Sequence, residues 1–112
     1  GKVLTSDASG NASWQAPSGG GSGITRSIVT TSGNVTAGAT ASTDYVYIIT
    51  GAHTVTLPTA VGNTNKYDLN NASGSPVSLA FTSGQTANGG GVTLGVNESI
   101  TLISDNANWR IL

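Results

Sequence analysis

Short runs of alternating apolar and polar residues fill the chain after residue 23. Val55 and Leu57 alternate with threonines, and Val77, Leu79 and Phe81 alternate with small residues. Successive side chains of a β-strand point to opposite faces, so a period of two predicts strands that bury one face only. No stretch shows the spacing of an amphipathic helix.

Glycine, asparagine and serine separate these runs at close intervals, as in residues 32–34, 72–75 and 87–91. These residue types favour tight turns. The pattern therefore predicts an all-β fold, a small antiparallel β-sandwich or barrel-like head domain over residues 24–112. The expected strands cover residues 24–31, 44–50, 53–57, 66–70, 76–82, 92–96, 98–104 and 109–112.

Segment 44–50 differs from the others because it is apolar on both sides. Tyr45, Tyr47 and Ile49 share one face, and Val46 and Ile48 share the other. A strand that is buried on both faces lies between the core of its own domain and a partner. We therefore predict that Val46 and Ile48 form a subunit interface.

The first 23 residues have a different pattern. Two short extended pieces, residues 2–5 and 12–15, flank a turn-forming stretch at 7–11, which predicts a small hairpin. Pro17 and the Gly/Ser run at 18–23 break any regular strand pairing and predict a flexible connection. The predicted division is a stem segment with its linker at 1–23 and a head domain at 24–112.

Charge and cysteine content exclude several partner classes. The chain has four Lys or Arg, five Asp or Glu, a net charge of −1 and no cysteine. It therefore lacks the basic stripe that binds nucleic acid or an anionic membrane surface, and it has no thiolate for a disulfide or a metal site. No apolar run is long enough for membrane insertion.

Candidate catalytic groups are few. Asp44, Asp68, Glu98 and Asp105 are the carboxylates of residues 24–112, and a glycosidase would need two of them about 5 to 10 Å apart. The chain contains neither a Gly-x-Ser-x-Gly turn nor a phosphate-binding loop with its lysine. We expect a protein that is not an enzyme and that carries no cofactor.

His53 is the only histidine of the chain. In a trimer, three copies of it could meet on the axis and hold a metal ion. A histidine in a turn more often simply begins the strand that follows. No metal site is therefore predicted.

Aromatic rings and polar loops are the candidate sugar contacts. A ring that carries a polar tip suits the apolar face and polar rim of a sugar. Tyr45 and Tyr47 are expected in the core or between subunits, and Trp109 is expected to anchor the last strand. The candidate ligand-binding residues that remain are Tyr67, Asn63, Asn65, Asn70 and Asn71.

Two parts of the sequence resemble a known family. Residues 1–14, GKVLTSDASGNASW, resemble a stem element of phage tail-fibre proteins and large bacterial surface proteins. Residues 53–58 (HTVTLP), 63–67 (NTNKY) and 98–111, which contain Asn-Trp, resemble the β-rich head modules of tail fibres and tail spikes. The resemblance implies a homotrimer at the distal end of a fibre, with the rest of the fibre upstream. It also implies a virion or extracellular location and attachment to a host-surface glycan or protein receptor.

Three functional hypotheses follow. The first is a non-enzymatic trimeric head that attaches a fibre to the host surface, through a glycan. The second is a module that only trimerises and caps the fibre, and the third is a monomeric carbohydrate-binding module of a secreted enzyme. Trimerisation would give a small domain additional buried apolar surface, and three copies on one axis would raise the avidity of weak sugar contacts.

Overall fold

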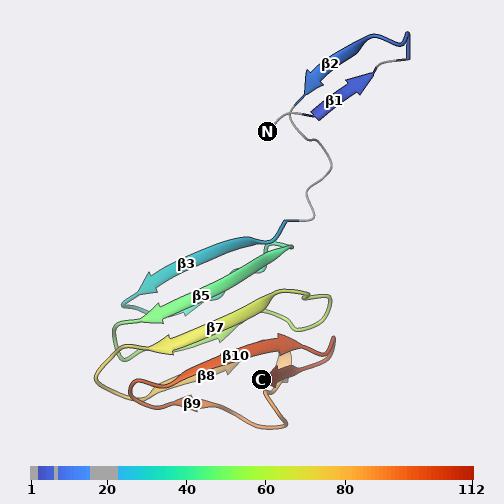
Figure 1. Ribbon diagram of the computed structural model, residues 1–112. Coiled ribbons are helices and arrows are strands. Elements are labelled where there is room, and N and C mark those ends of the chain that lie inside the picture. The colour runs from blue at the N-terminus through green and yellow to red at the C-terminus, as the bar shows by residue number, and fades with distance from the viewer. Residues whose placement is uncertain (1–2, 7, 16–22) are drawn as a thin grey trace.

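The computed structural model describes residues 3–6, 8–15 and 23–112 (Figure 1). The predicted hairpin is confirmed: β1 (Val3–Ser6) pairs antiparallel with β2 (Ala12–Gln15). Gly10 lies between these strands with a φ of 81°, which glycine adopts without a steric penalty. The predicted flexible connection at 18–23 lies, apart from Gly23, outside the described residues.

Residues 23–112 fold into strands joined by short connections, with one 3₁₀ turn, η1 (Thr82–Gly84). All eight predicted segments contain a strand. The described part of the chain has no helix long and apolar enough to cross a membrane. The strands are β3 (Thr25–Thr31), β4 (Val35–Thr36), β5 (Thr43–Ile49), β6 (Val55–Leu57), β7 (Lys66–Asn71), β8 (Val77–Phe81), β9 (Thr93–Leu94), β10 (Ser99–Ser104) and β11 (Trp109–Ile111).

These strands form two sheets, which confirms the predicted all-β, sandwich-like class. The five-stranded sheet has the order β11-β10-β7-β5-β3, and the four-stranded sheet has the order β4-β6-β8-β9. From β3 to β8 the chain alternates between the two sheets. Strands that follow one another in the sequence therefore lie in different sheets, as Figure 1 shows for β7 and β8.

The sheets are mixed, whereas the pattern of short strands and turns predicts mostly antiparallel neighbours. β3, β5 and β7 pair in parallel, as do β4, β6 and β8. Within these two sheets, the antiparallel pairs are β7 with β10, β10 with β11, and β8 with β9. The reason is that the tight turns send the chain across to the other sheet, so neighbours within one sheet are two strands apart in the sequence and run the same way.

The core lies between the two sheets and is filled by the inward residues of each strand. Tyr45 stacks on Tyr67 with ring centroids 5.2 Å apart, and Trp109 meets Tyr67 edge-on at 5.1 Å. Tyr47 is buried on the same face of β5 as Tyr45. The predicted core positions of the tyrosines of β5, and the role of Trp109 as an anchor of the last strand, are confirmed.

Candidate functional site

Tyr67, one of the candidate ligand residues, is fully buried. Its hydroxyl donates a hydrogen bond to the carbonyl oxygen of Gly38 at 2.6 Å and accepts one from Nδ2 of Asn63 at 2.8 Å. The side chain of Tyr67 therefore stabilises the loop between β4 and β5, and it offers no surface to a ligand. Asn63 is half-buried and supports this phenol.

Asn65 is 4% exposed and has a structural role of the same kind. Its side chain accepts a hydrogen bond from the backbone N–H of Thr43 at 3.1 Å and donates one to the carbonyl oxygen of Thr40 at 2.8 Å. It therefore stabilises the start of β5, and the fold already uses its side-chain amide.

Asn71 is the third buried candidate, with no exposed surface. Its Nδ2 lies 2.8 to 3.1 Å from the carbonyl oxygens of Ser75, Leu94 and Gly95. Its Oδ1 accepts hydrogen bonds from both the N–H and the hydroxyl of Ser73. Asn71 therefore joins the β7–β8 connection to the end of β9, and it too is unavailable to a ligand.

Asn70 lies on an outer surface, where its Nδ2 donates to Oγ of Ser99 at 2.5 Å. A shallow depression of about 230 Å³ adjoins it. Thr101, which donates to Asp68 at 2.5 Å, lines the same depression together with Leu112. Among the five predicted residues, Asn70 and Asn63, which lines another depression of about 210 Å³, therefore remain candidates for contact with another molecule.

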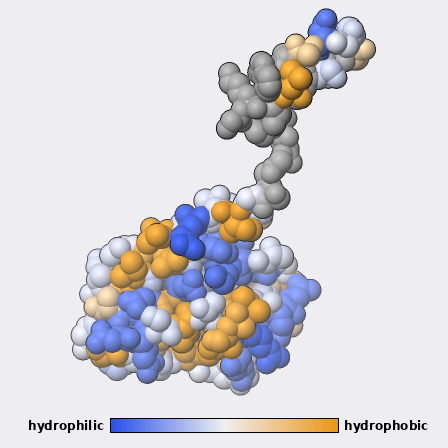
Figure 2. Space-filling model, viewed as in Figure 1, coloured by the Kyte–Doolittle hydropathy of each residue, from blue (hydrophilic) through white to orange (hydrophobic). Residues whose placement is uncertain are grey.

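The outer side of the five-stranded sheet, which we call the assembly face, combines apolar and charged residues. Ile28 and Leu112 are 63% and 72% exposed, and Val46 and Ile48 are half-buried. In Figure 1, β3, β5, β7 and β10 lie side by side. Figure 2, drawn from the same side, shows hydrophobic patches beside hydrophilic ones. Strand register gives three rows across this face: Arg26-Asp44-Lys66-Ile103, Ile28-Val46-Asp68-Thr101 and Thr30-Ile48-Asn70-Ser99.

The charges of the assembly face balance one another. Arg26, Asp44, Lys66 and Asp68 are two cations and two anions on three neighbouring strands. None of them forms an ion pair with a residue that the structure describes.

The outer side of the four-stranded sheet, which we call the hydroxyl face, is chemically different. Register places Thr36 beside Thr56 and Ala80, and Ser78 beside Thr93. Strands β4, β6, β8 and β9 contain no charged residue. A second shallow depression, of about 290 Å³, is lined by Asn34, Val35, Thr36, Thr54 and Thr56.

His53 precedes the β6 strand of this sheet. Its ring nitrogens lie 3.2 Å from the carbonyl oxygen of Thr31 and 3.4 Å from that of Thr54. Among the described residues, no group of three or more His, Cys, Asp or Glu could hold a metal ion. His53 thus has a structural environment at the junction of β3 and β6.

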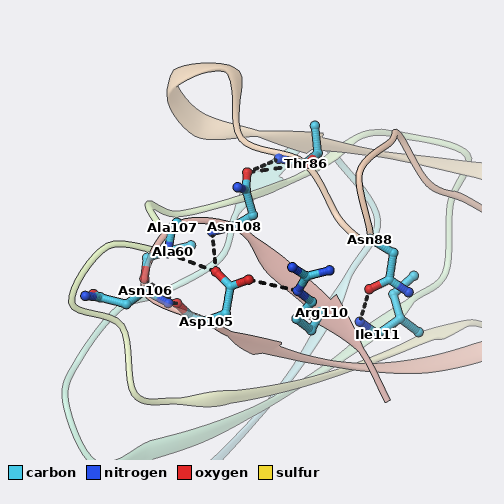
Figure 3. Close-up of polar contacts among 10 residues, drawn as sticks. Ala60, Thr86, Asn88, Asp105, Asn106, Ala107, Asn108, Arg110 and Ile111 are labelled. Atoms are coloured by element: carbon cyan, nitrogen blue, oxygen red, sulfur yellow. Dashed lines mark hydrogen bonds and ion pairs between the residues drawn. The ribbon is translucent and has the colours of Figure 1, made fainter.

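The β10–β11 hairpin contains the single ion pair of the described residues, between Asp105 and Arg110 at 2.8 Å (Figure 3). Oδ1 of Asp105 also accepts the N–H groups of Ala107 and Asn108. Three hydrogen bonds lower the pKa of Asp105. In order of decreasing effect, their donors are the N–H of Asn108, the side chain of Arg110 and the N–H of Ala107. The carboxylate therefore closes a hairpin and is not a free catalytic group.

Asn108, the residue before Trp109, holds the loop that precedes β9. Its Oδ1 accepts the N–H of Thr86 at 3.0 Å, and Oδ1 of Asn88 accepts the N–H of Ile111 at 3.1 Å (Figure 3). These bonds fix the last strand against residues 86–88. The Asn-Trp pair of the sequence is thus explained by closure of the fold.

Burial raises the pKa of Tyr47 and of Tyr67, since ionisation would place a charge inside the sandwich. The unfolded chain ionises near the ordinary value of about 10. Above that pH the unfolded state releases more protons, so we expect the free energy of unfolding to fall as the pH rises further. Below a pH of about 10, the contribution of these two phenols to the free energy of unfolding is fully present.

Replacing Tyr67 with phenylalanine tests this expectation. The variant leaves the carbonyl oxygen of Gly38 without its donor and should lose about 1 to 3 kcal/mol at pH 7. Its decline in stability between pH 10 and 11.5 should be shallower than that of the wild type. Urea unfolding at several pH values, followed by far-UV circular dichroism, measures both effects, and equal alkaline slopes would contradict the assignment to Tyr67.

Comparisons of this chain with protein-family models, with curated protein sequences and with solved structures found no match.

Proposed function

We propose that this chain is a non-enzymatic, trimeric head domain that attaches a viral or phage-like fibre to the surface of its host. The resemblance of residues 1–14 and of the head segments to fibre proteins supports the setting, on a virion or in the extracellular space. The observation that carries the proposal is the assembly face, where exposed apolar side chains lie beside balanced charges that have no ion-pair partner in the described chain.

The assembly face suits a second copy of the same chain. Arg26 and Lys66 balance Asp44 and Asp68, and Arg110 on β11 is paired with Asp105. The face therefore has no net charge, so copies do not repel one another and opposite charges can meet across the contact. A cyclic trimer packs one part of a surface against a different part of its neighbour. The two halves of this face differ in the required way: Ile28, Val46 and Ile48 lie on β3 and β5, whereas the depression beside Asn70 lies on β7 and β10.

The mass of the particle in solution tests whether the chain forms a trimer. The 112-residue protein should behave as a particle of three times 11.1 kDa in multi-angle light scattering at micromolar concentration. Val46→Glu should dissociate it, because each copy would bury a carboxylate where the interface has an apolar side chain, and the cost of removing that charge from water is high. Ser78→Glu, which adds the same charge on the other sheet, should leave the trimer intact. A monomeric wild type, or a Val46→Glu protein that remains trimeric, would contradict the proposal.

Attachment is tested separately with the intact protein. Fluorescently labelled trimer should bind the surface of some cells in a broad bacterial panel. A stable trimer that binds none of them would favour the second hypothesis, in which the module only trimerises and caps the fibre.

A further inference from the structure

We infer that the depression on the hydroxyl face is a binding site for a neutral glycan. The inference rests on the proposed attachment function, and it assigns the contact with the host to the hydroxyl face. If the assembly face of each copy is covered in the trimer, the hydroxyl face is the opposite side of the sandwich and remains open to a ligand. The buried candidates Tyr67, Asn65 and Asn71 take no part in it.

The site is built from threonines on strands that the core holds in place. Val55 and Leu57 are fully buried, so Thr56 points outward from β6, and Thr54, immediately before the strand, lines the same depression. Thr36 pairs with Thr56 in register, about 4.8 Å away across the sheet, and residues two apart along a strand lie roughly 6.6 Å apart. The hydroxyl groups therefore have a fixed spacing, and a ligand would not have to order a loop.

These hydroxyl groups are not used by the fold. Within the described part of the chain, Oγ1 of Thr36, Thr54 and Thr56 has no hydrogen-bond partner, whereas Oγ1 of Thr82 donates to the carbonyl oxygen of Leu57 at 2.8 Å. Asn34 accepts the N–H of Thr54 at 2.9 Å through Oδ1, which fixes its side chain at the edge of the depression. Its Nδ2 has no acceptor among the described residues. Three hydroxyls and one amide are thus free to donate or accept.

The chemistry of the site selects a neutral, polyhydroxylated ligand. A hydroxyl group both donates and accepts, as the hydroxyls of a sugar do. Phosphate, sulfate or a carboxylated sugar would require a cation, and the strands of this sheet contain none. The lining residues include no aromatic ring, so each copy would bind weakly, and three copies would gain by avidity.

Thr54→Val/Thr56→Val is the decisive variant, since valine keeps the shape of threonine and removes the hydroxyl. Thr64→Val, at an exposed position in the loop before β7, is its matched control. Both proteins and the wild type are applied to an array of neutral hexose oligosaccharides with sialylated and sulfated counterparts. We expect the wild type to bind neutral members and the double variant to bind at least about tenfold more weakly, because two hydrogen bonds per copy are lost. The control should bind like the wild type.

Other outcomes overturn the inference in distinguishable ways. Binding only to sialylated or sulfated members, or equal binding by the double variant, would show that the site is elsewhere while leaving attachment intact. Binding to cells with no binding to any array member would indicate a protein receptor. If the trimer bound neither cells nor glycans, the proposed attachment function would fail as well.

Discussion

Replacing Asn71 with aspartate is expected to lower the free energy of unfolding by about 3 to 5 kcal/mol at pH 7, which is enough to unfold many small domains. The substitution changes one amide into a carboxylate of the same shape. It removes the two N–H donors that reach Ser75, Leu94 and Gly95, and it aims a negative charge at three carbonyl oxygens in a fully buried position.

The pH dependence of this variant distinguishes charge from shape. A buried carboxyl has a raised pKa, so the folded variant favours the protonated form. Its stability should therefore be greatest below the ordinary aspartate pKa of about 3.9 and should be lost as the pH rises through the higher folded value. The deficit relative to the wild type should shrink as the pH is lowered from 7 to 4.

Asn70→Asp is the matched control, because Asn70 is adjacent in the sequence but lies on the assembly face. It should cost less than about 1 kcal/mol, in the range of ordinary surface substitutions. Urea unfolding followed by far-UV circular dichroism compares the three proteins. If Asn71→Asp were no less stable than Asn70→Asp, the buried hydrogen-bond network would not have the importance assigned to it.

Replacing Trp109 with alanine is expected to cost about 3 to 5 kcal/mol, the usual range for removing a large aromatic side chain from a core. Trp109 is fully buried and meets Tyr67 edge-on. The substitution would leave a cavity beside the stacked tyrosines and release β11 from the sheet. Trp109→Phe should cost clearly less, since it keeps a ring and removes a buried Nε1–H that has no acceptor in the described chain.

Chemical unfolding followed by far-UV circular dichroism checks this order, because both variants change tryptophan fluorescence directly. Arg110→Ala provides the control at the next position, whose side chain is 56% exposed and forms the surface ion pair with Asp105. It should cost at most about 1 kcal/mol. A loss for Trp109→Ala that is as small as the control would contradict its role as the anchor of the last strand.

Local features of this fold could be predicted from the sequence because they depend on neighbouring residues. Alternation predicted the strands and placed Tyr45 and Tyr47 inside, with Val46 and Ile48 on the opposite face. The two-residue strand β4 was missed because Val35 and Thr36 are too few to show a period. Parallel pairing was missed because a turn-forming sequence does not specify whether the chain returns to the same sheet or crosses to the other.

The candidate site was harder to predict because a polar side chain such as that of asparagine can be buried when the fold supplies its hydrogen-bond partners. Asn71 continues the inward series of Tyr67 and Leu69 on β7, so the same alternation that identified the core could have identified it as buried. Asn65 gave no such signal, since it precedes the strand and its partners are 22 and 25 residues away. The hydroxyl face also required register, because Thr36 and Thr56 become neighbours only when β4 and β6 pair.

The alternation of strands between two sheets also has a consequence for how the chain folds. Thr25 pairs with Thr43 and Asp44 with Lys66, so partners within the parallel sheet are 18 and 22 residues apart. Parallel pairing at this separation requires a loop to close before any contact forms, so we expect this domain to fold more slowly than a helical bundle of the same length. Asn71 depends on a similar separation, because Leu94 and Gly95, whose carbonyl oxygens accept from its amide, lie 23 and 24 residues further along the chain. Its buried amide is therefore fully hydrogen-bonded only when the end of β9 is in place, which couples the completion of one sheet to that of the other.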